Sequence, residues 1–177
     1  MIHTSSLYRT NPKYVYELDL LNHIQLDTNS QKFLIEYGLP HLIWDGTELK
    51  IKVLENFQPL NLKIKGRQNR FIKFGESEFG DFCVQSSEGA VYLVDESQNS
   101  HFVNSSIKCF ILFIIIYIEI RSQFEGFDKS GDDNYLYALY ENEAKFLEKE
   151  FAKFDPRAIV ESAVWSFRLE EIRNGAI

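Results

Sequence analysis

The chain is poor in the residue types that build disulfide frameworks and metal sites. Only two of its 177 residues are cysteines, and its four histidines are scattered. Such sites normally leave closely spaced cysteines or histidines behind. Cys83 and Cys109 instead lie far apart among apolar neighbours. We therefore expect two buried thiols in a reducing compartment, with no metal and no cofactor.

Positive charge is also scarce, with nineteen basic against twenty-six acidic residues and a formal net charge of -7. Such a surface repels a phosphate backbone unless it carries a strong local basic patch. The best basic cluster alternates with apolar residues, which is typical of the solvated face of a sheet. Its members are Lys63, Lys65, Arg67, Arg70 and Lys73. The charge balance predicts no nucleic-acid partner and suits a basic protein partner.

The most apolar stretch, residues 109–118, is shorter than the roughly 20 residues of a transmembrane helix. Polar residues 104–106 precede it, and Glu119 and Arg121 follow it. An apolar segment capped by Ser105 or Ser106 and ended by Gly126 is typical of a helix buried on all sides. A buried strand ranks second and a membrane span third, because periodicity cannot separate these alternatives in so uniform a run.

The first residues, MIHTSSLYRTNPKYVYELD, lack the pattern of a secretion signal, which is a basic region, an apolar core and a small-residue cleavage site. Together with the absence of a long apolar run, this pattern predicts a cytoplasmic protein with no membrane partner.

The chain does contain an ordered series of helix and strand patterns. A helix is predicted from an N-cap at Ser30 to a stop at Gly38, with Pro40 beyond it. Alternating strands then follow, and Gly89 is placed at the left-handed position of a hairpin turn. The predicted strands cover residues 49–54, 60–65, 70–75, 81–85, 90–95 and 101–103.

The last third is predicted to be helical. Residues 132–154 carry an apolar stripe, with Glu141 and Lys145 as a supporting ion pair. Asp155-Pro156 closes this helix and opens the next, with Asp155 as N-cap, and Asn174-Gly175 ends the last helix. The stripe comprises Leu136, Tyr140, Ala144, Leu147, Phe151 and Phe154. This order predicts an α+β fold with a mainly antiparallel sheet. We assign residues 1–30 to an N-terminal lead and 31–177 to a single domain.

No catalytic signature in the chain is complete. Residues 75–81 have the glycine spacing of a phosphate loop, but Asp81 occupies the position of the lysine. Residues 128–139 resemble a calcium loop with a misplaced glycine and Leu139 in place of its last carboxylate. His101 beside Ser105 lacks the elbow of a serine hydrolase. We predict no catalytic residue and no enzyme; a site assembled by the fold is the less favoured alternative.

Several short motifs together resemble the SUKH superfamily, which includes yeast cell-wall synthesis regulators and bacterial immunity proteins, and are most similar to its fourth bacterial group. The motifs are Gly38-Leu39-Pro40, Gly75, Phe82 to Val84, Gly89 to Tyr92, Asn104-Ser105-Ser106, Asp155-Pro156 and Trp165. The resemblance implies a sheet with an N-terminal helix and C-terminal helices packed on it. It implies structural roles for four residues: Gly38 as a helix stop, Gly75 in a turn, Asn104 in a cap and Trp165 in the core.

The resemblance also implies a function in binding. Members of this family are thought to neutralise a cognate polymorphic toxin delivered by contact between bacteria, often a nuclease or deaminase. Carboxylates and aromatic anchors would block the basic active site of such a toxin. The residues predicted to bind the partner are Glu76, Glu78, Asp81, Asp95, Glu96, Asp132 and Asp133, each of which is also explained by solubilising charge. An intracellular adaptor is the alternative, and the unusually apolar helix leaves a homodimer open.

Overall fold

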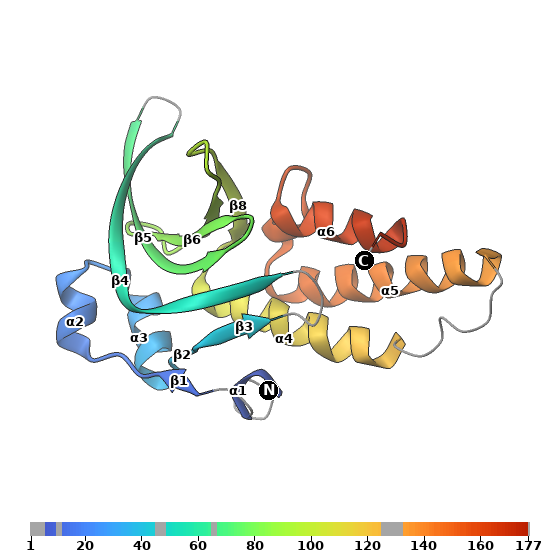
Figure 1. Ribbon diagram of the computed structural model, residues 1–177, viewed down its shortest axis with the longest axis horizontal. Helices are drawn as coiled ribbons and strands as arrows, with labels where there is room; N and C mark the ends of the chain where they lie inside the picture. The colour runs from blue at the N-terminus through green and yellow to red at the C-terminus, as the bar shows by residue number, and fades with distance from the viewer. Residues whose placement is uncertain (1–5, 10–11, 45–48, 65–66, 125–132, 177) are drawn as a thin grey trace.

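The computed structural model describes residues 6–9, 12–44, 49–64, 67–124 and 133–176, and it confirms the α+β class. A curled six-stranded antiparallel sheet lies beside a group of three C-terminal helices (Figure 1). The helices are α1 (Ser6–Arg9), α2 (Leu18–His23), α3 (Thr28–Glu36), α4 (Ile107–Phe124), α5 (Asp133–Phe154), the 3-10 turn η2 (Pro156–Ile159) and α6 (Val164–Arg173). The strands are β1 (Lys13–Tyr14), β2 (Leu39–Pro40), β3 (Leu42–Trp44), β4 (Lys50–Ile64), β5 (Arg67–Ser77), β6 (Gly80–Gln85), β7 (Val91–Val94) and β8 (Ser100–Asn104).

Strands β3 to β8 pair in chain order, each antiparallel to the next, while β1 and β2 form a separate small ladder. The two strands predicted at 49–54 and 60–65 are one continuous strand, β4. Its register against β5 shifts between Val53 and Gln58. A bulge of this kind bends a strand and increases its twist, which explains why β4 crosses the molecule and then turns upward with β5 (Figure 1).

Helix α4 forms the centre of the hydrophobic core, which confirms the buried-helix prediction. The backbone N–H of Cys109 donates to the hydroxyl of Ser106 over 3.1 Å, so Ser106 is the cap. The ring of Phe113 stacks on Phe151 of α5 at 4.0 Å. Nine residues of α4 are buried: Ile107, Phe110, Ile111, Leu112, Phe113, Ile114, Ile115, Ile116 and Tyr117. Among the described residues, no helix has the length and apolarity needed to cross a bilayer. The predicted stop at Gly126 lies outside the described residues.

The start of α3 differs from the prediction because Asp27, not Ser30, is its N-cap. Its carboxylate accepts hydrogen bonds from the backbone N–H groups of Asn29 and Ser30, both over 3.0 Å. Ser30 is buried inside the first turns instead. The predicted stop is confirmed: Gly38 has a φ of +69°, and a Cβ there would lie 2.2 Å from the carbonyl oxygen of Tyr14. Only glycine fits so close an approach without strain.

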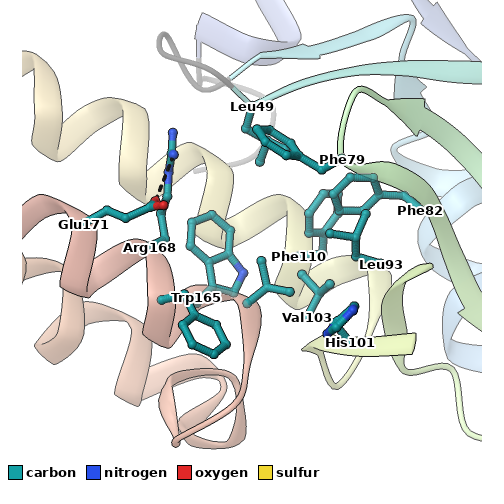
Figure 2. A pocket seen from close by; sticks show the side chains of 12 residues that line it. Leu49, Phe79, Phe82, Leu93, His101, Val103, Phe110, Trp165, Arg168 and Glu171 are labelled. Carbon is teal, nitrogen blue, oxygen red and sulfur yellow. Dashed lines mark hydrogen bonds and ion pairs between the residues drawn. The ribbon is translucent and has the colours of Figure 1, made fainter. Parts of the chain in front are cut away.

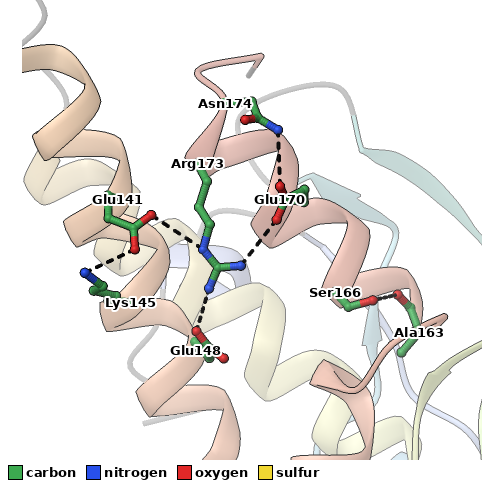
Figure 3. Close-up of polar contacts among 8 residues, drawn as sticks. All are labelled: Glu141, Lys145, Glu148, Ala163, Ser166, Glu170, Arg173 and Asn174. Carbon is green, nitrogen blue, oxygen red and sulfur yellow. Dashed lines mark hydrogen bonds and ion pairs between the residues drawn. The ribbon is translucent and has the colours of Figure 1, made fainter. Parts of the chain in front are cut away.

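Helices α5 and α6 pack side by side, with Arg173 bridging them (Figure 3). Its guanidinium lies 2.6 Å from Glu148 and 3.7 Å from Glu141 on α5, and 3.5 Å from Glu170 on α6. The predicted pair of Glu141 and Lys145 is confirmed at 3.1 Å. The predicted stripe is partly wrong, because Ala144, Leu147 and Phe151 are buried but Phe154 is 40% exposed. Phe154 is the last residue of α5, directly before the chain turns into η2.

The N-terminal residues contribute to the same core as the sheet and α4. Five apolar side chains before residue 31 are buried in it: Leu7, Tyr16, Leu21, Ile24 and Leu26. The hydroxyl of Tyr16 also donates to the carbonyl oxygen of Leu54 in β4 over 3.2 Å. These contacts connect the first short helices to the long strand of the sheet.

Candidate functional site

A cavity of about 360 Å³ lies between α6 and the face of the sheet that meets the helices. In Figure 2, Phe82, Leu93 and Val103 on the sheet side face Trp165 on α6, with Phe110 of α4 between them. The lining residues are Leu49, Phe79, Phe82, Leu93, His101, Val103, Phe110, Val164, Trp165, Phe167, Arg168 and Glu171. The wall is therefore almost entirely apolar, with charged side chains confined to a few positions.

The sheet side of this pocket is fixed by strand register. Phe82 pairs with Leu93, and Leu93 pairs with His101, so these three side chains lie in a row across β6, β7 and β8. The ring of Phe82 packs against Phe110 with centroids 5.4 Å apart. Strand pairing and the packing of buried Phe82 on Phe110 therefore fix the position of this wall.

The helix side of the pocket is fixed by a buried polar network. The indole N–H of Trp165 donates to the side-chain oxygen of Asn104 over 2.9 Å, and the amide of Asn104 donates to Asp155 over 3.2 Å. Asp155 also accepts from the backbone N–H and the hydroxyl of Ser105. Asp155 occupies the predicted N-cap position of η2, with Pro156 in the first turn, but its side chain makes no cap bond to η2 and instead holds the start of α4.

Gly75 also differs from its predicted role. It lies inside β5, and the turn of this hairpin falls at residues 78–79 instead. A Cβ on Gly75 would lie 2.6 Å from the Cγ2 atom of Ile51 on the neighbouring β4. The glycine thus allows a close approach between two strands near the register shift, and Gly89 (φ +74°) occupies the predicted left-handed position in the next hairpin.

Two large aromatic rings stand exposed at the pocket. Phe79 belongs to the β5–β6 turn and is 46% exposed, and Phe167 belongs to α6 and is 61% exposed. The turn is ordered by Ser77, whose hydroxyl accepts from the backbone N–H of Phe79 and donates to the carbonyl of Gly80. Exposed rings around an apolar hollow are typical of interaction sites. The sequence prediction missed both, since nothing local distinguishes Phe167 from a core residue.

Three ionisable side chains line the pocket, Glu171, Arg168 and His101, and Asp95 joins them through its contact with His101. Glu171 pairs with Arg168 over 3.2 Å, but its side chain is 48% exposed while that of Arg168 is 12% exposed. Asp95 accepts from Nε2 of His101 over 3.1 Å and from the backbone N–H of Asn99 over 2.9 Å. The hydrogen bond from His101, followed by those from Asn99, lowers the pKa of Asp95 to about 2. Asp95 therefore remains ionised under any physiological condition.

Two of the predicted partner-binding residues belong to the opposite face of the sheet. Glu76 pairs with Asp81 across the hairpin. Asp81 directly precedes Phe82, which faces the pocket, and successive side chains of a strand point to opposite faces, so both carboxylates point away from the pocket. Lys73 forms ion pairs with both carboxylates, over 2.7 Å and 2.9 Å. Partial burial lowers the pKa of Lys73, but hydrogen bonds to Glu76 and Asp81 outweigh it and raise the pKa overall. The hydrogen bond from Lys73 lowers the pKa of Glu76. Lys73 therefore compensates part of the negative charge of these two carboxylates.

The other predicted carboxylates, apart from Asp95, are Glu78, Glu96, Asp132 and Asp133. Glu78 and Glu96 are exposed in the β5–β6 and β7–β8 turns, which lie at the same end of the sheet. Asp133 is the first residue of α5, but its side chain, like all of Asp132, lies outside the described part of the chain. The structure thus brings Glu78, Asp95 and Glu96 to one end of the sheet.

The remaining reactive residue types are engaged in structural contacts. Burial raises the pKa of the Cys83 thiol to about 12 and raises that of Cys109, so neither thiol is activated. The hydroxyl of Ser105 donates to Asp155, whereas His101 contacts Asp95, so they do not form a nucleophile–base pair with each other. Within the described residues, no group of three or more histidine, cysteine or carboxylate side chains is arranged to hold a metal ion.

The fold and this pocket define an α+β protein with an apolar surface pocket between its sheet and its C-terminal helices. The family model described as SUKH-4 immunity protein matches residues 19–171, most of the chain. The chain therefore belongs to the SUKH-4 immunity protein family, which confirms the family predicted from its motifs and supports an immunity function. No curated protein and no solved structure matches the chain.

Proposed function

We propose that this protein neutralises a cognate toxin delivered by contact between bacteria, by binding the toxic domain and covering its active site. The observation that carries the proposal is the match to the SUKH-4 immunity family over residues 19–171. The exposed rings of Phe79 and Phe167 beside an apolar hollow support it further, since a stoichiometric inhibitor needs a surface able to form a stable complex.

The charge of the chain points to the kind of toxin. A nuclease or nucleic-acid deaminase needs a basic cleft to hold its phosphate-bearing substrate. A protein with a formal net charge of -7 is attracted to such a cleft and, once seated, keeps the substrate out. Inhibition of this kind requires no chemistry from the immunity protein. We place the encounter in the cytoplasm, where a nuclease or deaminase that has entered the cell reaches its substrate.

Co-expression tests the proposal. The toxic C-terminal domain encoded by the neighbouring reading frame is induced in cells with and without this protein. We expect growth to stop with the domain alone and to resume when the protein is present, with the two proteins purifying together. An unrelated toxin of the same catalytic class serves as the control and should not be neutralised. Absence of both rescue and complex would refute the proposed function.

A further inference from the structure

We infer that the pocket between α6 and the sheet is the toxin-docking site, and that it takes a bulky apolar side chain flanked by lysine or arginine on the toxin; this inference rests on the proposed function. Four properties of the pocket favour such an occupant: its size, its exposed aromatic edge, its charge and its preformed walls.

The size and lining of the pocket suit an apolar side chain. Its volume of about 360 Å³ falls within the range of roughly 300–1,000 Å³ that is usual for ligand pockets. The floor is formed by Phe82, Phe110 and Trp165, with Phe82 and Trp165 98% or more buried. The only hydrogen-bonding group of the Trp165 side chain is already satisfied by Asn104. A polar side chain would find few partners on this floor, whereas an aromatic or long aliphatic one would fill it.

The exposed rings indicate that the pocket is covered by another protein surface. Phe79 and Phe167 come from different elements, the β5–β6 turn and α6, yet both border the same cavity. Each leaves a large apolar area in water, and this area would be removed from water by a partner seated over the pocket. The free energy released by burying such rings is typical of interface anchor residues.

The charges around the pocket select a cationic partner. Glu171 is exposed, while the guanidinium of Arg168 is largely shielded and already paired with it. Asp95 is ionised and accepts a hydrogen bond from His101, and Glu78 lies in the turn next to Phe79. A cation beside the inserted side chain would meet the carboxylate of Glu171 or Asp95, whereas an anion would be repelled by them, since the guanidinium of Arg168 is only 12% exposed and already paired.

The pocket is rigid before binding. Strand pairing fixes Phe82 and Leu93, and the bonded chain from Trp165 through Asn104 to Asp155 fixes the α6 side. A pocket that is already formed loses little conformational entropy when a side chain fills it. More of the free energy gained by burying apolar surface therefore remains as binding affinity.

Binding of the neighbouring toxin domain to matched variants is the first test. Phe167→Ala should weaken affinity about tenfold or more, because an exposed anchor ring is lost without disturbing the core. Phe146→Ala is the control, since Phe146 on α5 is 55% exposed and does not border the pocket. Glu171→Gln should weaken affinity about fivefold at low salt and less at high salt. Its control, Glu119→Gln, replaces an exposed carboxylate on α4.

The outcomes separate the two claims. If the wild-type protein does not bind the domain, the proposed function fails. If it binds and Phe167→Ala behaves like Phe146→Ala, the proposed function stands and the inference is overturned. A wild-type dimer that Phe167→Ala dissociates would also overturn it, because a second copy would then be the occupant.

Small aromatic probes test the pocket without the toxin. Phenylbutylamine and phenylbutyrate share an apolar group and differ in the sign of their charge. Titration followed at the indole N–H resonance of Trp165 should show the amine binding about fivefold more tightly than the carboxylate at low salt. Phe167→Ala should weaken amine binding, and Phe146→Ala should not. No shift at Trp165, or equal affinity for the two probes, would contradict the inference.

Discussion

The carboxylate of Asp155, directly after α5, accepts hydrogen bonds from both the backbone N–H and the hydroxyl of Ser105, over 2.6 Å and 2.9 Å, at the start of α4. The same carboxylate accepts from the amide of Asn104, whose oxygen in turn accepts from Trp165. One buried acidic residue thus connects the ends of three segments: α5, the β8–α4 junction and α6. Through Asn104, Asp155 thereby holds Trp165, which forms the inner wall of the pocket.

We expect Asp155→Ala to lower the free energy of unfolding by about 3 kcal/mol, because it leaves buried donors on Asn104 and Ser105 without an acceptor. Urea denaturation monitored by circular dichroism measures this loss. Asp19→Ala, an exposed aspartate in the first turn of α2, should cost only about 0.5 kcal/mol. Equal losses in the two variants would show that the network does not stabilise the fold.

Gly75→Ala should destabilise the protein by about 2 kcal/mol, because its Cβ would lie 2.6 Å from Ile51 Cγ2 inside a packed sheet. Ile51→Ala removes the clashing atom. In the double variant the cost of Gly75→Ala should therefore fall by about 1 kcal/mol or more in a double-mutant cycle. Additive costs in this cycle would exclude the close approach as the reason for the glycine.

The pKa of Asp95, about 2 in the folded protein, should rise toward the ordinary aspartate value of 3.8 in His101→Ala, because the hydrogen bond from His101 is the largest cause of the low pKa. Carbon NMR titration of the side-chain carboxyl measures this directly. Since folding lowers the pKa, the ionised carboxylate stabilises the fold fully above pH 3.8 and loses this effect as the pH falls through about 2. An unchanged pKa in the variant would assign the shift to Asn99 instead.

The carboxylates on the two faces of the sheet should differ in their effect on binding. Glu76→Gln and Asp81→Asn should change toxin affinity less than twofold, because both groups lie on the face away from the pocket and each is already paired with Lys73. Asp95→Asn should weaken it about threefold at low salt. Isothermal titration calorimetry at two salt concentrations measures the toxin affinity of each variant. A larger loss from Asp81→Asn than from Asp95→Asn would place the toxin on the other face.

The sequence is informative wherever a structural feature depends on a few neighbouring residues. Ser106 capping α4, the stop at Gly38 and the left-handed Gly89 each follow from local backbone chemistry, and the structure confirms all three. The apolar run of α4 predicts burial because no face of the helix is polar. Family membership was predictable for a different reason, since it depends on the order of several weak motifs along the chain.

Features that depend on distant residues were not predictable. The two expected strands form one bent strand with a register shift between Val53 and Gln58, and no residue in this stretch predicts that shift. The register between β6 and β7 places Asp81 opposite Val94, on the face away from Leu93, and this pairing could not be predicted from the sequence alone. The N-cap position of Asp155 follows from the local sequence, but the partner of its side chain, Ser105, lies on another element and could not be predicted. The pocket has the same origin, since Phe79 and Phe167 meet only through the packing of α6 against the sheet.

The most direct measurement of the central claim is a titration of the neighbouring toxin domain's catalytic activity with this protein. At toxin concentrations well above the dissociation constant, activity should fall linearly and reach zero at one equivalent, and Phe167→Ala should turn the sharp endpoint into a gradual curve. Full toxin activity in the presence of excess wild-type protein would contradict the conclusion that this chain is the toxin's stoichiometric inhibitor.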